Sequence, residues 1–210
     1  MICYNSTNVG SNTEKMKQES ISKPFSWEFT WKTVSQGSLW QFSLIFVGCV
    51  SSLIYPHAPL VGLSAVAGNT LARKKALSCV MAIWLANQLY GFIIRKYPQT
   101  WESLTWGIVM GLATLLVTGL VTLRPSFCQR FWGHCLWLVI SVIGGYLLYQ
   151  GAIILIAQLM GGHGLTSAIL SRIFLKNCLW GLGLSLIHAC VIGVMMQFFS
   201  QYSPQSDYSS

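Results

Sequence analysis

One stretch of 19 residues without a formal charge limits most strongly what this chain can fold into. It runs from Ala76 to Ile94 and directly follows three cations, Arg73, Lys74 and Lys75. A helix of about 20 apolar residues is long enough to cross the hydrocarbon core of a bilayer. The three cations favour water, so they hold the turn before the helix at the membrane surface. The stretch therefore predicts a transmembrane helix that begins at a basic turn.

The rest of the chain has the same apolar character. Only 9% of the 210 residues are charged, whereas an ordinary soluble domain has about 25%. Six segments are apolar enough to form one membrane bundle: Leu39–Tyr55, Ala58–Ala72, Ala76–Ile94, Leu104–Leu123, Trp132–Met160 and Ile173–Phe199. The second segment is short, at 15 residues, and could be interfacial or re-entrant instead of crossing. We expect an all-α integral membrane bundle of six transmembrane helices.

The polar ends of the chain flank this bundle. Residues 1–36 lack apolar periodicity and predict a disordered or interfacial N-terminal tail. Residues 37–200 form the predicted transmembrane domain, and residues 201–210 are a second polar tail. The aromatic residues just before the first span are typical of a segment lying on the membrane surface.

Basic residues predict the orientation of the bundle. With six crossings and both termini in the cytoplasm, four Lys and Arg residues lie outside, and nine lie inside: Lys15, Lys17, Lys23, Lys32, Arg73, Lys74, Lys75, Arg124 and Arg130. This distribution obeys the positive-inside rule. If the second segment did not cross, every later loop would change side and the bias would weaken. The sequence thus predicts a multi-pass protein of the plasma (inner) membrane.

The charged residues also argue against several functions. The net charge is +8, but the cations flank apolar spans, so membrane orientation explains them without nucleic acid. No carboxylate lies inside a predicted span; the five are Glu14, Glu19, Glu28, Glu102 and Asp207. Buried acids usually serve proton relays, and no HExxH or GxxxxGK[ST] motif is present. We therefore expect no enzyme activity, catalytic residue, cofactor or metal ion.

Polar side chains within the spans are the candidate binding residues. In the six-crossing orientation they gather toward the outer leaflet: Asn87, Gln88, Trp106, Tyr149, Gln150 and Asn177, with His57 on an outer loop. Amides are costly in hydrocarbon unless they find partners, so they should face the bundle interior. Aromatic residues and a few amides commonly line a small-molecule site. The alternative interpretation is that each amide only bonds a neighbouring helix.

Two further patterns have both a structural and a functional interpretation. Gly48 and Ser52 form a small-xxx-small face on the first span, which suits internal packing or the docking of a partner subunit. His188 lies well inside the last span, where a structural hydrogen bond is the simpler interpretation and ligand contact the second. His57 and His163 on outer loops have no metal-binding spacing.

The order of segments from Pro56 to about Met110 resembles a known family. A first span ends at a proline loop, a short second span follows, and a basic inner turn precedes a third helix that ends in Gly91-Phe92 and Tyr97-Pro98. This resembles the S component, the substrate-binding membrane subunit of energy-coupling-factor vitamin transporters, and most of all its small cobalamin- and biotin-type members. The long polar N-terminal tail and a first span that is not alanine-rich depart from that family.

The resemblance implies a function and a site. It implies a vitamin bound near the outer face, between the last three helices, with Asn87, Gln88, Trp106, Tyr149, Gln150 and Asn177 near the substrate. It also implies that Gly48 and Ser52 face a transmembrane coupling subunit, which works with ATPases. Two alternatives remain: a non-transporting accessory or assembly subunit of a membrane complex, and a transition-metal permease using His57, His163 and His188.

Overall fold

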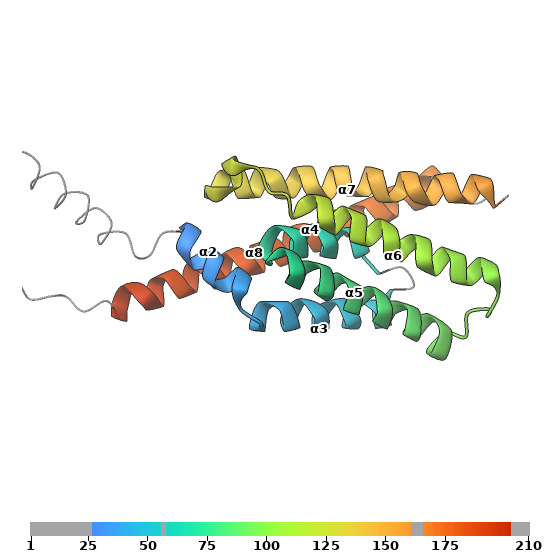
Figure 1. Cartoon of the computed structure of the whole chain (residues 1–210), viewed down its shortest axis with the longest axis horizontal. Helices are drawn as coiled ribbons and strands as arrows, with labels where there is room; N and C mark the ends of the chain where they lie inside the picture. The colour runs from blue at the N-terminus through green and yellow to red at the C-terminus, as the bar shows by residue number, and fades with distance from the viewer. Residues whose placement is uncertain (1–26, 56–57, 161–165, 203–210) are drawn as a thin grey trace, which may run out of the picture.

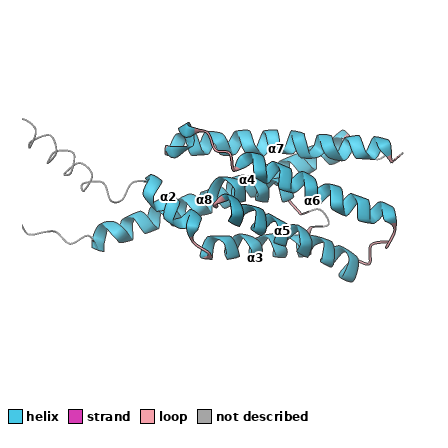
Figure 2. Ribbon diagram, viewed as in Figure 1, coloured by secondary structure: helices cyan, strands magenta, loops and turns pink. Residues whose placement is uncertain are grey.

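The computed structural model describes residues 27–55, 58–160 and 166–202, and within these ranges it contains helices and no strand. The all-α prediction is therefore confirmed for this part of the chain (Figure 2). Four of the described helices are long and apolar enough to cross a membrane, or five if one bent pair counts as a single span. His57, His163 and most of the predicted tails lie outside the described residues.

The helices follow one another with short connections. Their bounds are α2 (Trp27–Gln36), α3 (Leu39–Ile54), α4 (Leu60–Thr70), α5 (Arg73–Leu89), the π-helical turn η1 (Tyr90–Ile94), α6 (Trp101–Val121), the 3-10 turn η2 (Ser126–Gln129), α7 (Phe131–Leu159) and α8 (Ser167–Tyr202). The cations Arg73 and Lys74, predicted to precede a span, instead form the exposed first turn of α5.

Successive helices from α3 to α8 run in alternating directions (Figure 1). Arg95, just after η1, donates hydrogen bonds to the carbonyl oxygens of Ser52 and Leu53 near the end of α3, at 3.2 and 3.3 Å. The backbone N–H of Ala72, after α4, donates to the carbonyl of Ser35 at 3.2 Å. We name the end of the bundle that carries α2 the α2 end. The opposite end, which carries η1 and the start of α6, is the distal end.

Helix α4 lies in the centre of the bundle, and all eleven of its residues are buried. It packs against α3, α5, α6, α7 and α8. Eleven residues rise about 16 Å, roughly half of a 30 Å hydrocarbon core. The small residues Gly62, Ser64, Ala65, Ala67 and Gly68 allow this many neighbours to approach. The predicted second span is thus a short helix shielded from lipid by the rest of the bundle.

Helix α2 comes from the segment predicted as part of an interfacial tail. The structure gives it a helical conformation, bent by 65° from α3, with Thr30, Trp31, Val34 and Ser35 buried. The N–H of Gly37 donates to the carbonyls of Thr33 and Val34 and closes the helix. Residues 27–36 therefore belong to the folded bundle and cover its end.

Gly48 and Ser52 on α3 are both buried within the chain. A Cβ added at Gly48 would lie 2.7 Å from side-chain atoms of Ile83 on α5. The hydroxyl of Ser52 donates to the carbonyl of Gly48 at 3.2 Å. The small face predicted as a docking strip is occupied by α5, which favours the internal-packing alternative.

Candidate functional site

The residues predicted to bind substrate fall into two groups in the structure. Asn87 and Gln88 lie on α5 and Trp106 on α6, whereas Tyr149, Gln150 and Asn177 lie on α7 and α8. Helix α5 packs against α3, α4 and α6, while α7 packs against α4, α6 and α8. One group therefore lies on α5 and α6, and the other lies on α7 and α8. Helix α4 packs against all four of these helices.

Asn177 has partners for both ends of its side chain. Its Oδ1 accepts a hydrogen bond from the backbone N–H of Gly62 at 2.9 Å, and its Nδ2 donates to the carbonyl of Ile173 at 2.8 Å. Gly62 lies in the first turn of α4, where backbone N–H groups lack helical partners. Asn177, only 2% exposed, therefore caps the buried start of α4.

Tyr149 and Gln150 are buried on α7. Tyr149 belongs to an apolar cluster with Val61, Val117 and Tyr146. Gln150 is 6% exposed, and its Nε2 has no hydrogen-bond partner among the described residues. A buried polar group without a partner costs about 1–3 kcal/mol. Of the predicted amides, Gln150 is thus the one with a fully buried donor that has no partner within the described ranges.

The α5 group lies along the contact between α5 and α6. A Cβ at Gly107 of α6 would approach Oε1 of Gln88 to 2.5 Å, so the glycine makes room for this amide. Trp84 donates from Nε1 to the carbonyl of Gly107 at 2.9 Å. Asn87 and Trp106 are half-buried. This group joins two helices closely and contributes no residue to the cavity described next.

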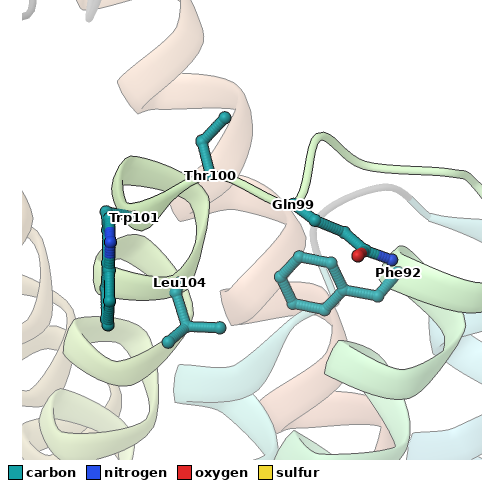
Figure 3. A pocket seen from close by; sticks show the side chains of 5 residues that line it. All are labelled: Phe92, Gln99, Thr100, Trp101 and Leu104. Atoms are coloured by element: carbon teal, nitrogen blue, oxygen red, sulfur yellow. The ribbon is translucent and has the colours of Figure 1, made fainter.

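A cavity of about 380 Å³ opens at the distal end, lined by Phe92, Gln99, Thr100, Trp101 and Leu104 (Figure 3). Phe92 comes from the π-helical turn η1, a feature frequent at functional sites. The Oγ1 of Thr100 accepts the N–H of Ser103 at 3.3 Å and caps α6. Figure 3 shows Gln99 beside Phe92, with Trp101 on the other side of Leu104. The lining thus combines two aromatic rings with one amide and one hydroxyl.

A second group of polar and aromatic side chains, not predicted from the sequence, is buried at the α2 end. Its members contact one another in series. The ring centroids lie 6.0 Å apart for Trp31 and His134, 6.1 Å for His134 and His188, and 5.0 Å for His188 and Trp40. The Nε1 of Trp40 donates to Oγ1 of Thr70 at 2.9 Å. We call this group the histidine cluster.

Arg124 brings a positive charge to the histidine cluster. Its Nε and Nη2 donate to the carbonyl of Gly68 at 3.0 and 2.7 Å, and Nη2 also donates to the carbonyl of Leu71. It therefore caps the buried end of α4, where helix carbonyls lack partners. Its guanidinium carbon lies 4.9 Å from the ring centroid of Trp31. Burial lowers the pKa of Arg124 to about 10, so it stays charged at neutral pH.

The histidine cluster holds several buried polar atoms with no hydrogen-bond partner in the described part of the chain. They are Thr30 Oγ1, Trp31 Nε1, Asn69 Oδ1, His134 Nδ1 and His188 Nε2. Asn69 is tied to the cluster because its Nδ2 donates to the carbonyl of His134 at 3.3 Å. Such a concentration of unpaired buried groups costs stability and is unusual in a packed interior.

The sequence carried a signal for this cluster. His134 lies on the same helical face as Leu138, Ser141, Val142 and Tyr146, all of which are buried. From the sequence alone, Arg124 indicates only the orientation of the bundle, and the position of Trp31 favours a place at the membrane surface. What the sequence did not show is that α2 folds back over the bundle end and brings Trp31 to His134.

Metal binding finds no support in the described ranges, where no three His, Cys, Asp or Glu residues are grouped as ligands. His188 pairs with His134, and the other two histidines of the metal-permease hypothesis lie outside those ranges. Comparison of the chain with models of protein families, with curated proteins and with solved structures finds no match.

Proposed function

We propose that the chain is a membrane-embedded substrate-binding subunit for the uptake of a vitamin or similar small molecule, which it captures at the distal end. The observation that carries this proposal is the cavity of about 380 Å³ between η1 and the start of α6. Ligand pockets commonly have volumes of about 300–1,000 Å³, with apolar walls and a few polar groups. The distal cavity has such a volume and lining and is open to the outside, because four of its five lining residues, all but Phe92, are exposed.

The lining indicates the chemistry of the ligand. Phe92 and Trp101 offer aromatic faces, Gln99 offers an amide, and none of the lining residues is charged. A flat ring with hydrogen-bonding groups at its edge suits such walls. Gln150 on α7 is not part of this lining, but its buried Nε2 has no partner among the described residues and is a second candidate donor.

The orientation supports capture from outside. We propose six crossings, with α4 as a shielded crossing and the α2 end in the cytoplasm. Described cations at the α2 end are Lys32, Arg73, Lys74, Lys75, Arg124 and Arg130, and those at the distal end are Arg95, Lys96, Arg172 and Lys176. The larger number at the α2 end follows the positive-inside rule. Energy would come from partner subunits, because the chain itself has no nucleotide-binding motif.

Thermal unfolding of the purified protein with a panel of vitamins and related heterocycles tests the proposal. We expect at least one compound to raise the unfolding temperature, and Trp101→Ala to weaken that effect about tenfold or more in apparent affinity. Trp132→Ala is the matched control, because Trp132 is 81% exposed and Trp101 is 84% exposed, and Trp132 lies at the α2 end. The proposal fails if no compound stabilises the protein, or if both variants respond alike.

The accessory-subunit hypothesis remains the second candidate because of Asn177. Both polar ends of this predicted binding residue are used within the chain, as expected if the intramembrane amides only join helices. Under this hypothesis no compound of the panel stabilises the protein, and replacing Gln150 by alanine changes stability but leaves any uptake intact.

A further inference from the structure

We propose that His134 and His188 form a proton-binding site that controls whether α2 stays docked on the bundle. This inference concerns the α2 end and does not depend on the identity of the distal ligand. It rests on the contacts of α2, on the charges around the two imidazoles, and on the hinge between α2 and α3.

The aromatic side chains of helix α2 contact the histidine cluster. Trp27 contacts His134 edge to face with centroids 5.8 Å apart, and Trp31 does so at 6.0 Å. Trp31 also stacks under the guanidinium of Arg124. Thr30 is fully buried, yet its hydroxyl has no partner among the described residues. The docked face of α2 therefore leaves polar groups unpaired, which makes its docking easier to reverse.

The hinge of α2 is anchored separately from its docked face. Lys75 on α5 donates from Nζ to the carbonyl of Gln36 at 2.6 Å and to Oγ of Ser38 at 3.1 Å. Gly37 lies between these two residues, where the chain bends by 65°. Undocking can therefore lift Trp27 and Trp31 from the bundle while the C-terminal end of α2 stays attached.

The groups around the two imidazoles oppose a further positive charge. The guanidinium of Arg124 lies 4.9 Å from the ring centroid of Trp31, and the Trp31 ring contacts His134, which in turn stacks on His188. On α2, Lys32 pairs with Glu28 at 2.7 Å on the exposed side, and the start of α5 adds Arg73, Lys74 and Lys75. Cys128, beside Arg124, has its pKa raised by burial and stays neutral. No carboxylate of the described residues packs against the imidazoles, and α3 and α4 bring no charged residue.

The direction of the effect follows from these charges. With α2 docked, a protonated imidazole is buried against a second imidazole, and the positive charge of Arg124 lies on the Trp31 ring beside it. With α2 undocked, the ring reaches water, where imidazole titrates near pH 6.5. Protons therefore bind more strongly to the undocked state, and by linkage acid favours undocking. Below about pH 6.5, lowering the pH by one unit raises the undocking equilibrium constant by up to about tenfold for each imidazole that is protonated on undocking.

Hydrogen–deuterium exchange of the full chain in lipid nanodiscs tests this inference between pH 7.5 and pH 5.0. After correction for intrinsic exchange, peptides from α2 should exchange about tenfold faster or more at the acidic end, whereas peptides from α6 should not. The variant H134Q/H188Q should show no such pH dependence. The matched control H57Q/H163Q removes the other two histidines of the sequence and should keep the response.

Three outcomes overturn the proposal. The first is corrected exchange in α2 that does not change with pH, and the second is an unaltered response in H134Q/H188Q. Should that variant fail to fold, judged by circular dichroism, the single variants H134Q and H188Q replace it. Each retains one imidazole and should lower the steepness of the pH response; two single variants with the wild-type steepness are the third contrary outcome.

Discussion

Asn177 on α8 caps the start of α4, because its Oδ1 accepts a hydrogen bond at 2.9 Å from the N–H of Gly62, 115 residues earlier in the chain. This bond satisfies one of the N–H groups left free at the start of α4. Water cannot do so there, since Leu60, Val61 and Gly62 are all buried. The last helix of the chain is thus needed to complete the central one.

Replacing Asn177 by leucine should destabilise the protein by about 1–3 kcal/mol, because the N–H of Gly62 would stay buried without an acceptor. Ser171→Ala is the control, as this exposed residue on α8 bonds only within its own helix. Denaturant unfolding in detergent measures both variants. Equal stability of N177L and S171A would show that the cap is not important for folding.

Gly62 is also a point of close contact between helices. A Cβ there would lie 2.6 Å from the carbonyl oxygen of Asn177 and 3.2 Å from the N atom of Gly181. Because both atoms belong to the backbone, Gly62→Ala must push α4 and α8 apart, and we expect a loss of about 1–3 kcal/mol. At Gly144 nothing lies within 4 Å, so Gly144→Ala should be neutral or stabilise by up to about 1 kcal/mol. The same unfolding assay compares the stability of the two variants. A smaller loss of stability in G62A than in G144A would contradict the close contact between α4 and α8 at Gly62.

The contact between Gly48 and Ile83 can be examined by a double-mutant cycle. Gly48→Ala places a Cβ 2.7 Å from Ile83, which should cost about 1–3 kcal/mol. Ile83→Ala removes the clashing atoms, so the double variant should lose less stability than the sum of the single variants. If Gly48 instead serves a partner subunit, G48A should leave the isolated protein unchanged and weaken its assembly.

The positions of the long apolar helices follow from the sequence, because long uncharged segments have few other solutions. The predicted span Leu104–Leu123 corresponds to α6, and Trp132–Met160 to α7. The short segment Ala58–Ala72 was harder, since length alone does not tell a re-entrant piece from a central helix. The role of its small residues becomes clear only from the structure, in which α4 packs against α2, α3, α5, α6, α7 and α8.

The candidate sites could be predicted only in part. The cost of an amide in hydrocarbon predicts that Gln150 faces the bundle interior, and both Gln150 and its neighbour Tyr149 are buried. The sequence could not show that Asn177 would be paired by Gly62, because that bond depends on the packing of α8 on α4. Nor could it show the histidine cluster, which requires α2 to bend back at Gly37.

Arg124 should be sensitive even to a conservative replacement. Its guanidinium donates to the carbonyls of both Gly68 and Leu71, and a lysine ammonium lacks this planar set of donors. We expect Arg124→Lys to lose about 1 kcal/mol or more, and Arg124→Met about 1–3 kcal/mol for each buried carbonyl left without a donor. Arg130→Met, at an exposed arginine six positions later, should change stability by less than about 0.5 kcal/mol. Denaturant unfolding of the three variants in detergent measures these losses of stability. Equal losses in R124M and R130M would show that Arg124 does not stabilise the end of α4.

Reporter fusions can establish whether α4 counts as a crossing. Alkaline phosphatase is active only outside the cytoplasm, and green fluorescent protein fluoresces only inside, so pairs of truncated fusions report the side of each loop. In the proposed orientation, phosphatase should be active after Tyr55 and after Gln99, and fluorescence should follow fusion after Lys75 and after Ser126. Fusion after Lys75 retains the three cations Arg73 to Lys75, which hold that loop inside. If α4 does not cross, fusions after Tyr55 and after Lys75 report the same side. The loops at Gln99 and Ser126 then exchange sides, and the proposed capture of a ligand from outside at the distal cavity is no longer possible.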